Sequence, residues 1–279
     1  MNERELATRI RQDLQRAAAG RGRVLYLEGK TDVPILLALL GAQHPLEVSD
    51  AVLHDGVLIR GLRGDRDGSG SSAVTQHLEV ARRHVYPGVF GVLDGDGEEL
   101  HALAAEFDAP HAGPRFRWKS YCIENLLARG GWPEPWGPAA GPQEALRAFA
   151  PYVALNRVGS ELRGRLRQLR LHRFIRPTYD ELHTADEVLG MLRAGKELLA
   201  GVDVVALFAA ELDAFHAALA RDLDEAHALL NGKWLVDVFA PRRTGRTQTQ
   251  CRDEWTEHLR RAGGDPEIKA WWRRVVAPA

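Results

Sequence analysis

The chain has 279 residues, with 37 basic against 38 acidic side chains and a formal net charge of −1. All but five of the basic residues are arginines, whose planar guanidinium binds phosphate in a bidentate manner, although a biased base composition of the genome would explain them equally well. No apolar run approaches the roughly 20 residues of a membrane helix, the N-terminus lacks the apolar stretch of a signal peptide, and Cys122 and Cys251 lack zinc-site or disulfide spacing. We therefore expect a cytoplasmic protein with no membrane partner.

Hydrophobic periodicity predicts the elements of the N-terminal half. Residues 3–18 carry an apolar side chain every four positions, which is typical of an amphipathic helix. Continuous apolar runs predict buried strands, separated by helices that end near Leu40 and His84. The predicted strands are residues 24–27, 57–59, 89–93 and 121–127, of which 57–59 is the weakest.

Alternation of strands and helices indicates an α/β fold with a largely parallel sheet. The prolines and glycines of residues 130–142 mark a boundary, after which the pattern is mainly helical. We divide the chain into an N-terminal helix (1–21), an α/β domain (22–128) and a helical C-terminal region (143–279). The helices predicted in that region are residues 144–152, 160–174, 185–199, 204–230, 249–262 and 267–276.

Acidic residues follow two of the predicted strands. Glu28 comes directly after the first strand with Asp32 four positions later, and Asp94 and Asp96 come directly after the strand at 89–93. Because the carboxyl ends of parallel strands share one edge of the sheet, these carboxylates would repel one another unless a cation neutralised them. Mg²⁺ or Mn²⁺ suits such oxygen ligands, and a pair of ions would suit phosphodiester chemistry.

Two phosphate or metal motifs are excluded by their spacing. A P-loop would need a glycine five positions before Gly29, where the chain has Val24. A calcium loop beginning at Asp94 would need glycine at its sixth position and glutamate at its twelfth, which are Glu99 and Ala105.

Plainer roles exist for the same acids. Asp32 could cap a helix that begins at Val33, and Asp94 and Asp96 could form an ordinary Asp-Gly turn. Glu124, inside the predicted strand 121–127, is harder to explain in this way, because burying an unpaired carboxylate is costly.

Three strings in order resemble one family. LEGKTD at 27–32, GVLDGD at 91–96 and YCIENLL at 121–127 resemble the Toprim domain of topoisomerases, primases and OLD-family nucleases, and more closely the OLD-like proteins that accompany ATPases in bacterial anti-phage systems. The resemblance covers roughly residues 22–128 and implies a Toprim-like Rossmannoid parallel sheet flanked by helices.

The resemblance also implies roles for individual residues. Glu28 would bind metal or act as general acid/base, and Asp94 and Asp96 would be the metal-binding pair. Asp32 would help to hold a second ion, and Glu124 matches a later acidic position. Lys233, in Asn231-Gly232-Lys233, resembles a lysine that stabilises charge on the phosphorus, although a solvated lysine would give the same pattern.

Clustered arginines suggest where nucleic acid would bind. A helix would place Arg163, Arg167 and Arg170 on one face, and Arg242, Arg243 and Arg246 lie in a predicted loop after Pro241. A solvated helix face and a flexible loop are the plainer alternative.

Together these features predict a divalent-metal-dependent nuclease that cuts DNA or RNA, tRNA included, as the effector of an anti-phage system controlled by an ATPase partner. The helical half would also suit a homodimer. A haloacid-dehalogenase-like phosphatase with Asp94 as nucleophile, or a partner-binding module without catalysis, are the alternatives.

Overall fold

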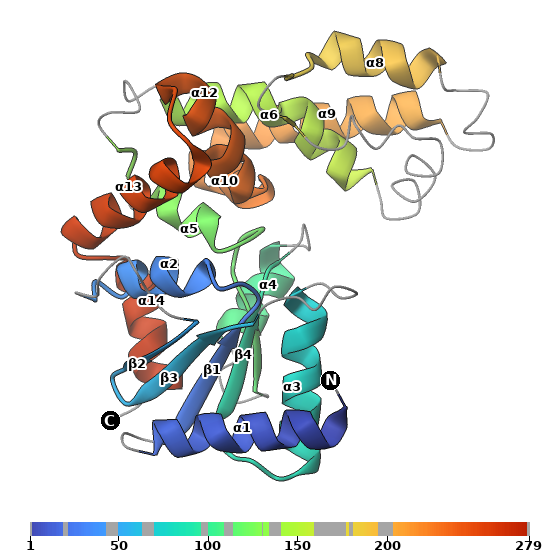
Figure 1. The fold of residues 1–279 in the computed structure, drawn as a ribbon. Coiled ribbons are helices and arrows are strands. Elements are labelled where there is room, and N and C mark those ends of the chain that lie inside the picture. The colour runs from blue at the N-terminus through green and yellow to red at the C-terminus, as the bar shows by residue number, and fades with distance from the viewer. Residues whose placement is uncertain are drawn as a thin grey trace. The chain divides into compact units, whose positions relative to one another are not determined.

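The structure is a computed structural model. It describes residues 2–18, 22–42, 50–62, 70–95, 100–108, 114–129, 131–133, 141–158, 177–178, 181–194 and 203–277. The chain divides into two compact units, the first formed by Met1–Gly130 with Trp255–Ala279 and the second by Gly131–Glu254. Figure 1 shows the elements of both units.

A mixed sheet forms the centre of the first unit. Its order is β2-β3-β1-β4-β5, and all neighbours are parallel except the β2 and β3 pair. The strands are β1 (Arg23–Leu27), β2 (Ala51–His54), β3 (Val57–Gly61), β4 (Val89–Leu93) and β5 (Arg115–Arg117). The α/β class with a mostly parallel sheet is thereby confirmed.

Helices cover both faces of this sheet. On one face α1 (Glu3–Ala17) and α3 (Gly70–Arg83) lie against each other and share a core with β1 and β4. The opposite side carries α2 (Asp32–Leu39), which contacts β3 and α5 (Glu124–Arg129), while α4 (Leu100–Asp108) packs on β5. The four successive residues Val24 to Leu27 of β1 are all buried, as expected for a strand covered on both faces.

A buried polar cluster joins α1 to the sheet. The Asp13 carboxylate forms an ion pair with Arg60 Nη2 at 2.9 Å, and it accepts a hydrogen bond from the Tyr26 hydroxyl at 3.0 Å. Burial, followed by the nearby Asp13 charge, raises the pKa of Tyr26. Tyr26 therefore stays protonated and remains the donor to Asp13.

The C-terminal segment returns to the sheet. Trp271, at the end of α14 (Pro266–Trp271), is 1 % exposed and stacks with Phe107, with edge contacts to Phe116 and Trp118. The next residues, η5 (Trp272–Val276), are a π-helix. Residues 255–279 belong to the first unit and not to the helical C-terminal region predicted at 143–279. Their aromatic side chains complete the core of the first unit.

Two more contacts tie η5 to strands of the sheet. Trp272 Nε1 donates to Asp55 Oδ2 at 3.0 Å, in the turn between β2 and β3, and Arg23 of β1 donates to the Val276 carbonyl at 2.9 Å. The C-terminal segment is therefore bound to the sheet by polar contacts as well as by its tryptophans.

The second unit is helical throughout its described elements. Phe149 and Tyr152 of α6 pack against Trp234, and α6 also packs on α9. The predicted helix 204–230 is interrupted at Asp222, whose extended backbone and side chain cap a new helix. The elements are α6 (Gly141–Arg157), α8 (Ala185–Ala194), α9 (Val204–Arg221), α10 (Leu223–Leu229), α11 (Gly232–Trp234), η4 (Leu235–Phe239), α12 (Ala240–Thr244) and α13 (Gln248–Arg261), the last of which continues into the first unit. Among the described helices, none has both the length and the apolar composition needed to cross a membrane.

Candidate functional site

Glu28 lies where the connections from two neighbouring strands diverge. The chain leaves β1 for α2 on one face of the sheet, whereas it leaves the adjacent parallel strand β3 for α3 on the other face. In α/β proteins, ligands commonly bind at the carboxyl ends of the strands where the connections diverge in this way. Glu28 directly follows β1 at this point.

A hydrogen bond joins the two predicted acidic segments. The Glu28 carboxylate, through Oε1, accepts the backbone N–H of Asp94 at 2.9 Å. The parallel register explains the contact, since Leu27 pairs with Val92 and both strands end at the same edge. Glu28 is half-buried and Asp94 is 7 % exposed. The structure therefore brings together residues that are far apart in the sequence.

The N-terminus of α3 lies against Glu28. A Cβ atom at Gly70, the first residue of α3, would lie 2.6 Å from the Glu28 carbonyl oxygen and 2.8 Å from the Glu28 Cβ. Only glycine allows this approach. The positive end of the α3 dipole is thus placed next to the acidic edge.

The Asp32 side chain accepts hydrogen bonds within the turn that follows β1. Its Oδ2 accepts the Gly29 N–H at 2.8 Å, and its Oδ1 accepts the Thr31 hydroxyl at 3.4 Å. It is the first residue of α2 and is 7 % exposed. These contacts stabilise the Glu28-Gly29 turn, while a metal-binding role of Asp32 stays a prediction.

Glu124 begins a helix, so the predicted strand at 121–127 is wrong. Residues 119–123 form turns and α5 starts at Glu124. The turn is stabilised by the Ser120 hydroxyl, which donates to the Cys122 carbonyl at 3.0 Å, and by Asn125 Oδ1, which accepts the Cys122 N–H at 2.9 Å. The prediction failed because a short, fully buried apolar segment looks the same in the sequence whether it forms a strand or a helix.

The turn before α5 touches the end of β4. A Cβ atom at Gly95 would lie 2.3 Å from the Ser120 carbonyl oxygen, so the two backbones are nearly in contact. The Trp118 N–H donates to the Leu93 carbonyl at 3.1 Å. This places the segment that leads to Glu124 beside the loop that carries Asp94.

Glu124 carries a buried oxygen that lacks a hydrogen bond. Its side chain belongs to a residue only 1 % exposed, and Oε2 has no hydrogen-bond partner. A buried carboxylate without compensation is unfavourable, so a cation or a donor is needed there. Among the described residues no group of three or more His, Cys, Asp or Glu side chains is arranged to hold a metal ion. Asp96, predicted as a ligand, lies outside the described residues.

Lys233 belongs to the helical unit. It lies in α11, and Asn231 Oδ1 accepts its backbone N–H at 3.1 Å as the helix cap. The Asn231-Gly232-Lys233 string therefore forms the start of a helix, with Asn231 as its N-cap. The role of Lys233 toward phosphate stays a prediction.

Arg242 and Arg243 of the second arginine group lie in α12, so the predicted loop is wrong for them, whereas Arg246 does lie in the loop between α12 and α13. Pro241 suits the first turn of α12, and Gly245, with φ of 70°, ends that helix. Arg243 forms an ion pair with Glu144 at 2.6 Å, and Arg246 forms one with Glu254. Arg242 is exposed. Arg163, Arg167 and Arg170 lie outside the described residues.

Lys30 is not among the site residues that the sequence motifs predict. It is exposed in the turn that directly follows Glu28 and Gly29. Its position after a strand that ends in an acidic residue could have indicated a cation beside the site. The glycine- and serine-rich sequence at the start of α3 would suit either an anion-binding helix start or an ordinary serine-capped loop, but its place beside Glu28 depends on how the loops pack.

Comparison of the chain with protein-family models, with curated proteins and with solved structures gives no match.

Proposed function

We propose that the protein is a divalent-metal-dependent nuclease with a Toprim-like catalytic domain, which hydrolyses phosphodiester bonds of DNA or RNA. The hydrogen bond between the Glu28 carboxylate and the Asp94 backbone carries the proposal, because it joins two acidic segments at the carboxyl ends of neighbouring parallel strands.

The donor set of this edge suits a hard cation. Glu28, Asp94 and Asp96 would hold the ion, and the Glu124 oxygen that lacks a hydrogen bond is the observation that favours a cation nearby. Asp32 would contribute to a second ion if its carboxylate turned from Gly29. Bound Mg²⁺ or Mn²⁺ would supply an activated water and stabilise charge on the phosphate.

The chain's own groups would orient the substrate. The N-terminus of α3 offers a positive dipole end beside Glu28, and Lys30 offers an exposed ammonium in the adjacent turn. Both would attract the phosphate of a polynucleotide. The Asp94 N–H holds the Glu28 carboxylate in place, where Glu28 would bind the ion or accept a proton.

Control by a partner is part of the proposal. The sequence contains no P-loop, so nucleotide-dependent control would come from a separate ATPase, as in the anti-phage systems that the motifs resemble. A nuclease without such control would damage its host.

Activity assays test the proposal. Plasmid, single-stranded DNA and tRNA are incubated with the protein and Mg²⁺, Mn²⁺ or chelator, alone and with co-purified partners. Glu28→Gln and Asp94→Asn should abolish metal-dependent cleavage, while Glu79→Gln, an exposed acid on α3, should not. Cleavage that survives in the double variant would refute the proposal, and hydrolysis of a small phosphomonoester with intact polynucleotide would favour a phosphatase.

Metal binding gives a second, activity-independent measurement. Mn²⁺ should raise the melting temperature of the wild-type protein, and Glu124→Gln should remove most of that rise, because the amide is neutral. In chelator, Glu124→Gln should be as stable as wild type or more stable, by up to about 1–3 kcal/mol, since it removes a buried charge. An unchanged response to Mn²⁺ would place Glu124 outside the metal site.

A further inference from the structure

The helical unit contains a cavity that the proposed nuclease site does not use. Its volume is about 340 Å³, and it lies between α6, α9 and the segment that precedes α8. Pro151 and Leu212 form part of its buried wall, while Arg147 and His216 are exposed at it. This volume is at the lower end of the range for small-ligand pockets, roughly 300–1,000 Å³.

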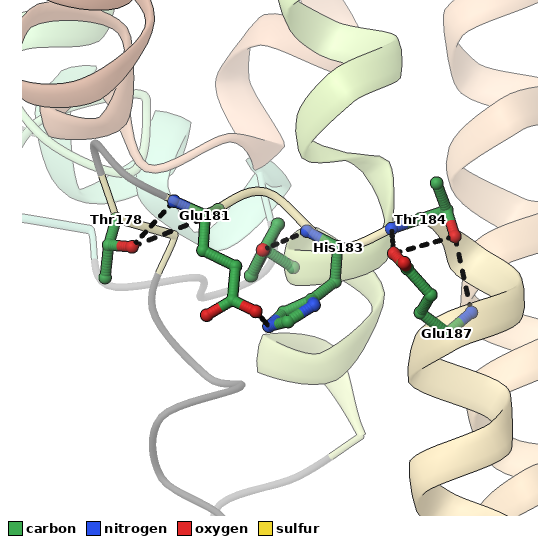
Figure 2. A network of polar contacts seen from close by, with 6 residues as sticks. Thr178, Glu181, His183, Thr184 and Glu187 are labelled. Atoms are coloured by element: carbon green, nitrogen blue, oxygen red, sulfur yellow. Dashed lines mark hydrogen bonds and ion pairs between the residues drawn. The ribbon is translucent and has the colours of Figure 1, made fainter.

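The wall before α8 is held in place by hydrogen bonds. The backbone N–H of His183 donates to the hydroxyl of Tyr152 at 2.7 Å, and Tyr152 is fully buried in α6. Thr184 and Glu187 bond each other's backbone N–H groups, which caps α8. Figure 2 shows this network, with the Glu181 and His183 side chains facing each other. The pocket therefore has a fixed wall.

Cationic and imidazole groups surround the cavity. Arg147, His183 and His216 line it, and none of the described residues that line it is acidic. Burial raises the pKa of the Tyr152 hydroxyl, whereas the hydrogen bond from His183 and the charge of Arg242 lower it, which places the Arg242 charge near this wall. Glu181 and Glu187 are the acids that act on the same hydroxyl.

A ligand for this pocket needs a flat apolar part and a negative charge. Unpaired bases stack on histidine rings and on guanidinium planes, and their phosphates bind arginine. An acyl chain would contact only the apolar wall and would not engage Arg147 or His216. A nucleotide uses both kinds of surface.

We propose that this pocket receives one unstacked nucleotide of a single-stranded nucleic acid. The inference extends the proposed nuclease function, since it names a single-stranded segment as the feature of the substrate that the helical unit binds. Arg147 would contact the phosphate and His216 would stack on the base. Leu212 and Pro151 would contact the remaining face of the base.

Binding can be tested without cleavage. In chelator, fluorescence anisotropy compares a labelled 12-nucleotide single strand with the same strand carrying abasic sites. The wild-type protein should prefer the intact strand by about tenfold, because stacking of a base contributes on that scale. Arg147→Ala combined with Ala148→Trp, which fills the pocket from a partly exposed position, should abolish the preference.

The controls separate this inference from the nuclease proposal. Arg193→Ala, an exposed arginine of α8 outside the pocket lining, should bind as wild type does, and circular dichroism checks that each variant is folded. An equal affinity for intact and abasic strands, or binding of an acidic peptide at the pocket in place of nucleic acid, would overturn the inference. Loss of cleavage in Glu28→Gln with the base preference intact would leave it standing.

Discussion

Burial lowers the pKa of two histidines in the folded protein. Burial lowers the pKa of His77 on α3, and it lowers the pKa of His227 on α10 to about 4 from the ordinary value of 6.5. The unfolded chain binds a proton on His227 below pH 6.5, whereas the folded chain does so only near pH 4. Protonation of His227 therefore favours the unfolded state between these two pH values. The stability that the protein has with neutral His227 is lost as the pH falls from 6.5 towards 4.

Lowering the pH from 7 to 5 should destabilise the helical unit through His227. The expected loss is on the order of 2 kcal/mol, and His227→Gln should remove most of it, because glutamine does not titrate in this range. Urea unfolding at both pH values measures the difference. His258→Gln, on the part of α13 that lies in the first unit, serves as the control for a histidine substitution outside the helical unit. An identical pH dependence in wild type and His227→Gln would contradict the prediction.

The close contact between the start of α3 and Glu28 makes the candidate site sensitive to the position of this helix. Because a Cβ at Gly70 would meet the backbone and Cβ of Glu28, Gly70→Ala should displace either the helix or the glutamate. A displacement of about 1 Å can reduce a catalytic rate about 100-fold, so we expect a large loss of cleavage with only a modest fall in melting temperature.

Gly190→Ala in α8 is the matched control for that change. A Cβ there meets no atom within 4 Å, and alanine is favoured over glycine within a helix by about 0.5–1 kcal/mol. This variant should be slightly more stable and fully active. Full activity of Gly70→Ala would show that the position of Glu28 does not depend on α3.

The elements that were predicted well have a strong local pattern. The strand predicted at 89–93 and the amphipathic helix predicted at 3–18 match β4 and α1 closely. A strand that is buried on both faces is a continuous apolar run, whereas a helix that is buried on one face has apolar residues every three or four positions, so the two patterns are easily distinguished. The edge strands β2 and β5 were missed, since they are short and partly exposed. Only pairing with a neighbour makes them strands.

The site shows the same division. The meeting of Glu28 with Asp94 followed from the sequence, because parallel strands end at one edge. The approach of Gly70 and of Ser120 did not, because loops pack according to tertiary contacts that no local pattern records. Glu124 was correctly expected to be a buried carboxylate, but its helical backbone depends on the hydrogen bonds that Ser120 and Asn125 make with Cys122.

At the scale of the whole molecule, the two units should unfold separately. Each has its own aromatic core, with Trp271 buried in the first unit and Phe208 of α9 buried in the second. Trp271→Ala should lower the transition of the first unit by about 3–5 kcal/mol, and Phe208→Ala should lower that of the second by a similar amount.

Differential scanning calorimetry distinguishes these transitions. Mn²⁺ should raise only the transition that Trp271→Ala lowers, because the proposed metal ligands belong to the first unit. A single transition that both substitutions lower equally would mean that the units unfold as one.

The return of residues 255–279 to the sheet has a consequence for biosynthesis. The whole helical unit must leave the ribosome before the tryptophans of α14 and η5 can close the core of the sheet unit. The core of the sheet unit is then closed late, after the helical unit has left the ribosome. A nascent chain halted inside the helical unit would carry Glu28 and Asp94 without the tryptophans that complete the core of their domain.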